Sequence, residues 1–208
     1  MLKLNKTRPL PAGLSITSYK DWQPGTPIRA LLDNDCHCKC YICEDKPKNA
    51  AELTVDHVVS KDHTPALALE WDNLLLACAQ CNNEVKGSRF NGIINPAEEN
   101  GLDPEAVIDF DMSYDRRDVR ITVRSIDAAV AETKKLLDEV YADQTLTRKL
   151  AANIQEFIRL IPFADIGQEW ATEYISDNIS SSAAFAAFKR KIIRDDSKLC
   201  SRFAEAFV

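Results

Sequence analysis

The chain has 208 residues, of which 45% are hydrophobic and 28% charged, and its formal net charge is −6. This length fits one compact domain or two small ones, and the apolar fraction can bury a core. The negative charge argues against a protein that binds nucleic acid unaided, because phosphate contacts normally need a basic surface. No apolar run approaches the roughly 18 residues of a membrane span, and the N-terminus has no signal-peptide core, so no membrane contact is predicted.

The N-terminal third predicts short elements separated by loops. Residues 1–24 are rich in Pro and Gly and predict an extended arm, with a short strand near residues 2–4. Thr26 followed by Pro27 predicts a short helix over 27–32, with Thr26 as its N-cap. The β-branched run 53–59 predicts a strand. Residues 60–70 are expected to form a loop, and an apolar run over 73–77 leads to a helix that begins near Ala79 and stops at Gly87.

The rest of the chain changes from strands to helices near residue 125. Residues 91–104 predict a connector, and 107–112 with 119–123 predict a hairpin with a polar turn over 113–118. Helices are expected over 126–137, 146–160, 168–177 and 181–207, with Pro162 ending the second. Four aromatic side chains at near-helical spacing predict a packing stripe in the last helix, namely Phe185, Phe188, Phe203 and Phe207. We therefore expect an N-terminal arm and short helix (1–35), an α+β module (36–125) and a helical module (126–208).

Seven cysteines indicate bound metal rather than a disulfide framework. Four of them form two Cys-x2-Cys pairs, Cys40 with Cys43 and Cys78 with Cys81. An odd count with such pairs is typical of a reducing compartment, so a cytoplasmic protein is expected. Four thiolates in two pairs can make a closed tetrahedral zinc site. We predict that this zinc is structural and joins the two ends of the segment between the pairs.

The remaining cysteines have other expected roles. Cys36, His37 and Cys38 stand directly before the first pair and could compete as zinc ligands, but we expect them to be loop residues. Cys200 is expected to be a buried apolar thiol in the last helix.

Between the two pairs lie groups suited to metal-assisted hydrolysis of a phosphodiester. His57 can take a proton from water, because an imidazole titrates near neutral pH. Asp56 offers an oxygen ligand for a hard divalent cation, and the Asn82 amide, held beside Cys81, offers a second. Neighbouring side chains on a strand point to opposite faces, so Asp56 and His57 can share a pocket only at a bulge or a strand end.

Other polar residues of this segment are expected to support the reaction. Lys86, four residues after Asn82, and Arg89 are predicted phosphate contacts. Asn73 is predicted to bond backbone groups and so to hold the loop after the His57 strand. Several alternatives stay open: Asn83 or Glu84 as the metal ligand, His63 as a phosphate or base contact rather than a surface residue, and His57 as a core histidine.

These motifs, in this order, resemble the HNH endonucleases of the ββα-metal fold. The pattern runs from Cys-x2-Cys through Asp-His and Asn-x8-Asn to a Lys, over roughly residues 36–90. The resemblance implies a zinc-stapled ββα-metal module, with His57 as general base, Asn73 as the structural Asn and Asp56 as a metal ligand. Asn82 stands where the family usually has a final His. An HNN variant is therefore expected, with Mg²⁺ or Mn²⁺ as the catalytic ion, bound more weakly by an amide than by an imidazole.

A narrower resemblance concerns the first cysteine pair and the chain start. Residues 39–44 and the Pro-rich basic N-terminus are similar to the HNH nuclease subunit of Septu-type anti-phage systems, some of them linked to retrons. This resemblance implies an ABC/SMC-like ATPase partner, and in retron-linked systems a retron RNA/DNA complex. A partner that helps to hold nucleic acid would also account for the acidic net charge. The alternatives are a non-catalytic zinc-bearing subunit that binds nucleic acid or an ATPase, and an adaptor whose helical half carries the function.

Overall fold

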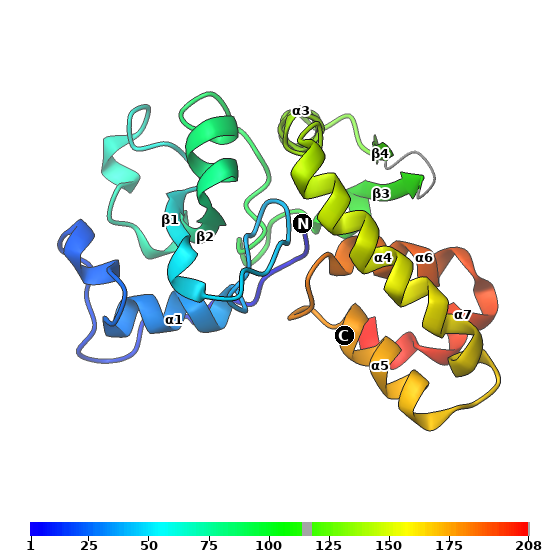
Figure 1. The fold of residues 1–208 in the computed structure, drawn as a ribbon. Helices are drawn as coiled ribbons and strands as arrows, with labels where there is room; N and C mark the ends of the chain where they lie inside the picture. Colours follow the sequence, from blue (N-terminus) through cyan, green and yellow to red (C-terminus); the bar gives the residue numbers. More distant parts are fainter. Residues whose placement is uncertain (114–117, 208) are drawn as a thin grey trace.

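The computed structural model describes residues 1–113 and 118–207, so the centre of the predicted polar turn, 114–117, lies outside the described residues. Figure 1 shows α1, β1 and β2 on one side of the molecule and α4 to α7 on the other, with the N-terminus between them. The fold is therefore α+β, as predicted, with a helical C-terminal half. No helix in the described part of the chain is both long and apolar enough to cross a membrane.

The first half is built on one antiparallel strand pair. It contains α1 (Pro27–Asp35), β1 (Leu53–His57), β2 (Leu74–Cys78) and a π-helical segment, η5 (Gln80–Lys86). β1 and β2 pair from Leu53 opposite Cys78 to His57 opposite Leu74. Leu74 to Ala77 are all buried, so β2 is a core strand of this half of the molecule. This hairpin followed by η5 is the ββα arrangement that the resemblance implied.

Local sequence signals set several element ends. Thr26 Oγ1 accepts the Arg29 N–H at 3.2 Å, which confirms the predicted N-cap of α1. Gly87 adopts a φ of +47° and ends η5, where its N–H donates to Asn82 O at 2.8 Å. The predicted strand near residues 2–4 is wrong. Leu2 and Leu4 are buried in the core instead, and the Leu4 N–H donates to Pro96 O at 2.9 Å.

The second half begins with another hairpin and continues as helices. Its elements are α2 (Pro104–Val107), β3 (Ile108–Ser113), β4 (Asp118–Val123), α3 (Ala128–Val140), α4 (Gln144–Asp165), α5 (Glu169–Ile179), α6 (Ala186–Asp195) and α7 (Ser197–Arg202). β3 and β4 pair antiparallel, as predicted. α3 packs on β4, and α4 packs on α5.

The structure differs most from the predicted helices at Pro162 and in the segment 181–207. Pro162 lies inside α4, which continues to Asp165, because one missing N–H removes a single helical hydrogen bond in the last turn. The predicted helix over 181–207 is instead divided into α6 and α7. Phe185 precedes α6 in the left-handed region, with φ +53°, and its ring is buried. Asp196 separates the two helices and caps α7 by accepting the Lys198 and Leu199 N–H groups.

The buried side chains form two clusters. The larger runs from the N-terminal arm through β2 to Val130, Leu137 and Phe188, so its packing continues across residue 125. The smaller lies among α4 to α7 around Phe157 and also contains Phe203. The four predicted aromatic packing residues are therefore shared between two cores: Phe185 and Phe188 lie in the larger, and Phe203 and the partly buried Phe207 in the smaller.

Candidate active site

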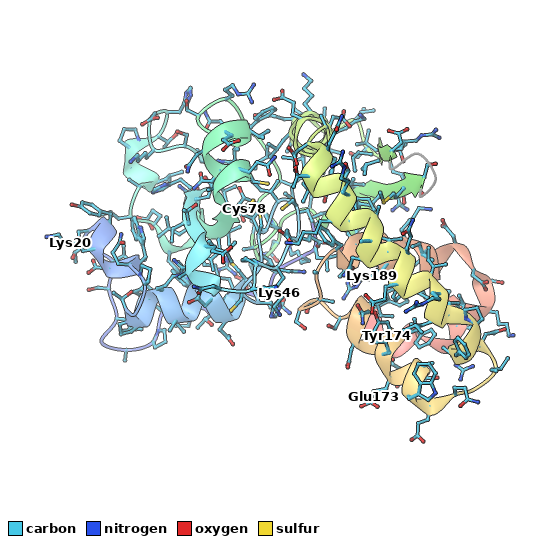
Figure 2. All side chains as sticks on the ribbon, viewed as in Figure 1. Lys20, Lys46, Cys78, Glu173, Tyr174 and Lys189 are labelled. Carbon is cyan, nitrogen blue, oxygen red and sulfur yellow. The ribbon has the colours of Figure 1, made fainter. Side chains whose placement is uncertain are left out.

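The four paired cysteines come together at the end of the first hairpin. The Sγ atoms of Cys40, Cys43, Cys78 and Cys81 all lie within 4.8 Å of one another. Cys78 ends β2 and Cys81 lies in η5, whereas the first pair comes from the loop before β1. Figure 2 marks Cys78 at this position beside the hairpin. Four thiols at this spacing fit a tetrahedral zinc ion, so the cluster could hold the predicted structural metal.

The cysteines and the histidine before the first pair stay outside this cluster. Burial raises the pKa of Cys36 to about 12, and its sulfur accepts the Leu76 N–H at 3.4 Å. His37 and Cys38 lie in a tight loop, with φ values of +55° and +53°. The structure therefore places all three as expected, in or beside a loop. Cys200 is only partly buried, in contrast to the prediction.

His57 is the last residue of β1 and faces a cavity. Its Nε2 lies 2.9 Å from the Ala68 carbonyl oxygen, and the Trp22 ring meets its ring edge-on with centroids 6.0 Å apart. A carbonyl oxygen can only accept a hydrogen bond, so Nε2 must carry the proton. In the neutral ring Nδ1 is then unprotonated, which is the state that a general base requires.

Asp56 is held from two sides. It is 4% exposed, and its Oδ2 accepts the Tyr41 hydroxyl at 2.7 Å while its Oδ1 lies 3.2 Å from Lys86 Nζ. Burial raises the pKa of Asp56, and the Lys86 ammonium and the Tyr41 hydroxyl oppose that rise. Burial, and then the charge of Asp56, raise the pKa of Tyr41 well above its usual value, so its hydroxyl stays a donor.

The two predicted phosphate contacts are both engaged within the protein. Lys86 is 0% exposed, and its ammonium also donates to the His57 carbonyl oxygen at 2.7 Å. The predicted phosphate contact at Lys86 does not fit this burial, because a buried carboxylate and a carbonyl satisfy the ammonium. Arg89 is 57% exposed and pairs with Glu139 at 2.8 Å. A phosphate would have to compete with the Glu139 carboxylate for the Arg89 guanidinium.

Asn73 lies directly before β2 and bonds the loop after β1. Its Oδ1 accepts the Val59 N–H at 2.8 Å, and its Nδ2 donates to the carbonyl oxygens of Val59 and Leu67 at 2.9 and 3.0 Å. The side chain is buried, so these three bonds satisfy its amide. They hold the chain on both sides of the segment that carries Ala68, the hydrogen-bond partner of His57.

Asn82 lies at the start of η5, opposite β1. Its Nδ2 donates to Thr54 Oγ1 at 2.9 Å and to Val55 O at 3.4 Å. These bonds orient the amide and leave Oδ1 without a hydrogen-bond partner among the described residues. An oxygen in this state is suited to a hard cation. Asn83 and Glu84 are both exposed, and Asn83 lies at the same cavity.

The cavity brings most of these residues together. It has a volume of about 570 Å³, and its walls include Asp56, His57, Asn82, Tyr19 and Trp22. Asp56 and His57 thus share a cavity because β1 ends at His57, which is the strand end that the sequence required. Mg²⁺ commonly binds through one or two protein oxygens together with water and phosphate, so Asp56 and Asn82 fit such an ion. Lys61 also lies at this wall and is exposed.

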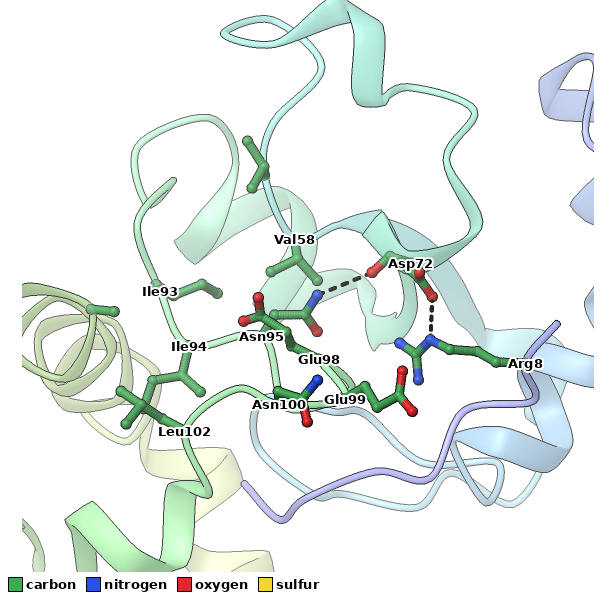
Figure 3. Close-up of a pocket in the computed structure, with 12 residues that line it drawn as sticks. Arg8, Val58, Asp72, Ile93, Ile94, Asn95, Glu98, Glu99, Asn100 and Leu102 are labelled. Carbon is green, nitrogen blue, oxygen red and sulfur yellow. Dashed lines mark hydrogen bonds and ion pairs between the residues drawn. The ribbon is translucent and has the colours of Figure 1, made fainter.

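A second cavity of about 510 Å³ has a different character. Figure 3 shows that Asp72, Glu98 and Glu99 line it, together with Arg8, which pairs with Asp72 at 2.7 Å. Asn95 donates to the Asp72 carbonyl oxygen at 3.0 Å. Three carboxylates against one paired cation disfavour a phosphate. The cavity at His57 is therefore the candidate active site.

Sequence reasoning missed four residues at or behind this site. Tyr41 lies inside the first Cys-x2-Cys pair, and this position next to a predicted zinc ligand was a usable signal. Lys61 lies four residues after His57, where a cation close to the site could be anticipated. Tyr19 and Trp22 reach the cavity only because the N-terminal arm folds back over β1, and no motif spacing reports such a contact.

Comparison with known proteins finds a match over the segment that carries Asp56, His57 and Asn82. The family model described as HNH endonuclease matches residues 40–87, from the first cysteine of the four-cysteine cluster to the glycine that ends η5. Residues 40–87 are therefore similar to HNH endonucleases.

At the level of individual proteins, the chain resembles the Septu protein PtuB of Bacillus thuringiensis. The two are 33% identical over 69 residues, which is 32% of this chain and 25% of that protein. The match thus spans about a quarter of the relative's length. No solved structure matches the chain.

Proposed function

We propose that this protein is a metal-dependent endonuclease that hydrolyses phosphodiester bonds in nucleic acid. The observation that carries the proposal is the state of His57. Its Nε2–H is bound to the Ala68 carbonyl, which leaves Nδ1 as a base, and it shares a cavity with Asp56 and Asn82. If His57 had only a packing role, neither the cavity nor the side-chain oxygens of Asp56 and Asn82 beside it would be explained.

The residues of the chain have distinct tasks in this mechanism. Nδ1 of His57 takes the proton from a water that attacks the phosphorus, and the Ala68 carbonyl stabilises the imidazolium that results. Asn73 holds the loop that presents this carbonyl. Asp56 and Asn82 would hold Mg²⁺ or Mn²⁺, which supplies positive charge to the phosphate and to the leaving oxygen when bound.

The zinc site and the buried pair keep these groups in place. The four cysteines would hold zinc and thereby join β2 and η5 to the loop of the first pair, which fixes Asn82 through its neighbour Cys81. Tyr41 and Lys86 hold the two carboxylate oxygens of Asp56. Lys61 is the exposed cation at the cavity wall, and Arg89 can meet a phosphate that displaces Glu139.

The biological setting proposed is anti-phage defence. The similarity to the Septu protein PtuB supports the role of an effector nuclease, and the sequence resemblance adds an ABC/SMC-like ATPase partner and, in retron-linked systems, a retron RNA/DNA complex. Seven free cysteines fit a reducing cytoplasm. Co-expression with such an ATPase should give one co-eluting complex, and separate elution of the two proteins without a gain in cleavage would contradict the partnership.

A His57→Ala variant tests the catalytic assignment. We expect it to lose at least about 100-fold in cleavage rate with Mg²⁺ or Mn²⁺, because it lacks the general base. It should keep its zinc content and its thermal stability. His63→Ala is the matched control, because His63 is exposed and its ring bonds the Ser88 carbonyl alone among the described residues.

Other outcomes of this experiment favour other functions. If the His57→Ala variant cuts as fast as the parent, the catalytic assignment is wrong and the non-catalytic zinc-bearing subunit is favoured. If the variant loses its fold, His57 is a core histidine. Mapping the ends of cleaved DNA and RNA identifies which polymer the parent protein hydrolyses.

A further inference from the structure

The candidate active site has an aromatic wall that its hydrolytic chemistry does not use. Tyr19 and Trp22 both line the cavity of His57 and are the two ends of one 3₁₀-helix, η1 (Tyr19–Trp22). A 3₁₀-helix has three residues per turn, so side chains three positions apart lie on the same face. Trp22 is 8% exposed and packs edge-on against His57, whereas Tyr19 is 65% exposed. One ring thus contacts the catalytic residue and the other is open to solvent beside it.

The segment that carries Tyr19 is fixed by hydrogen bonds. Ser18 and Asp21 form a capping box, in which Asp21 Oδ2 accepts the Ser18 N–H at 2.9 Å. The same oxygen accepts the Thr17 N–H at 2.7 Å. Thr26 Oγ1 donates to the Asp21 carbonyl oxygen at 2.6 Å and so ties η1 to the start of α1. The position of the Tyr19 backbone is therefore set by its own turn and by α1.

We propose that Tyr19 stacks on an unpaired base next to the phosphate that is attacked by the water that His57 deprotonates, so that the preferred substrate is single-stranded or locally unpaired nucleic acid. This inference rests on the proposed nuclease function. A base inside a duplex has both faces covered by its neighbours, and only an unstacked base offers a face to an aromatic ring.

The charges at the cavity make such a contact useful. The cavity walls carry the exposed Lys61 together with two carboxylates, those of Asp56 and Asp62, and Lys86 is buried and pairs with Asp56. Phosphate attraction alone is therefore weak here, in agreement with the net charge of −6. Stacking is independent of charge and of base identity, so it can supply binding without sequence specificity.

Binding of fluorescent oligonucleotides tests the proposal without relying on cleavage. The probes carry 2-aminopurine, whose fluorescence falls on stacking, in single-stranded DNA, single-stranded RNA and duplex DNA of the same sequence. The protein is the full chain with His57→Ala, which prevents hydrolysis. We expect added Tyr19→Ala to weaken single-strand binding about 10-fold and to abolish the quenching. Tyr19→Phe should preserve both, and duplex affinity should be the same in all variants.

A matched control separates stacking from a general loss of surface aromatics. Trp170 is 51% exposed on α5, outside the cavity, and Trp170→Ala should leave every affinity unchanged. The proposal is overturned if Tyr19→Ala weakens duplex and single-strand binding equally, or if it changes neither. Failure of the nuclease function would look different. In that case the parent cleaves no polymer, while the loss of quenching in Tyr19→Ala still reports the stacked base.

Discussion

At the scale of single residues, the Asp56 carboxylate is held by hydrogen bonds from two sides. Its two oxygens bond Tyr41 and Lys86, and both partners are buried. A buried ion pair contributes little net stability, but removing one partner leaves an uncompensated charge. Lys86 is therefore better understood as the companion of Asp56 than as a phosphate contact.

This arrangement predicts a strong effect of Lys86→Met. Without its ammonium the Asp56 carboxylate lacks a cation, and the free energy of unfolding should fall by about 3–5 kcal/mol. Urea denaturation of the zinc-loaded protein measures this change, and added Mg²⁺ should restore part of it. Lys134→Met is the control, because Lys134 pairs with Asp138 on the exposed face of α3 and should cost only ~0–1 kcal/mol. Equal effects of the two substitutions would contradict the role assigned to Lys86.

At the scale of elements, some helix ends are set by neighbouring residues and others by contacts with distant segments. Thr26 and Gly87 act on neighbouring backbone groups, so their effects on α1 and η5 could be predicted. The break before α6 has a distant cause. The Phe185 N–H donates to Glu44 O at 3.1 Å, and the Ala187 N–H donates to Glu44 Oε2 at 2.9 Å. A continuous helix over 181–207 would lose these contacts with the loop after the first cysteine pair.

At the scale of the whole molecule, the four-cysteine cluster is connected to the helical half. Tyr141, at the end of α3, donates its hydroxyl hydrogen to the Cys43 carbonyl oxygen at 3.1 Å. Glu44 accepts the two N–H groups at the start of α6, and Lys149 of α4 pairs with Asp45 at 2.6 Å. The loop that would hold one side of the zinc thus contacts three helices. Loss of the metal should therefore affect both halves.

Cys81→Ser tests this coupling. The parent should bind about one zinc ion per chain, and the variant should lose it and unfold more than about 10 °C lower. Elemental analysis and thermal unfolding by circular dichroism measure the two quantities. Cys200→Ser is the control, since Cys200 lies outside the four-cysteine cluster and should leave both unchanged. A second transition at the parent's temperature, arising from α4 to α7, would show that the halves are independent.

The amino-acid sequence by itself determined the features that depend on near neighbours and on fixed spacing. The two cysteine pairs predicted the four-cysteine cluster. The ββα order was implied by the family resemblance, which depends on the step from Asp56 to His57 and on the interval from Asn73 to Asn82. Element ends set by Thr26 and Gly87 followed from the same local chemistry, because caps and turns act within a few residues of backbone.

The tertiary structure decided which of these groups face solvent and which are buried. It buried Lys86 beside Asp56 and brought Tyr19 from the N-terminal arm to the cavity. It also placed the Ala68 carbonyl oxygen at Nε2 of His57, so that Nδ1 is the nitrogen without a proton in the neutral ring. Each of these facts depends on contacts between segments that are distant in the chain. Burial and pairing of a charge are properties of the folded surroundings, so periodicity and motif spacing could not reveal them.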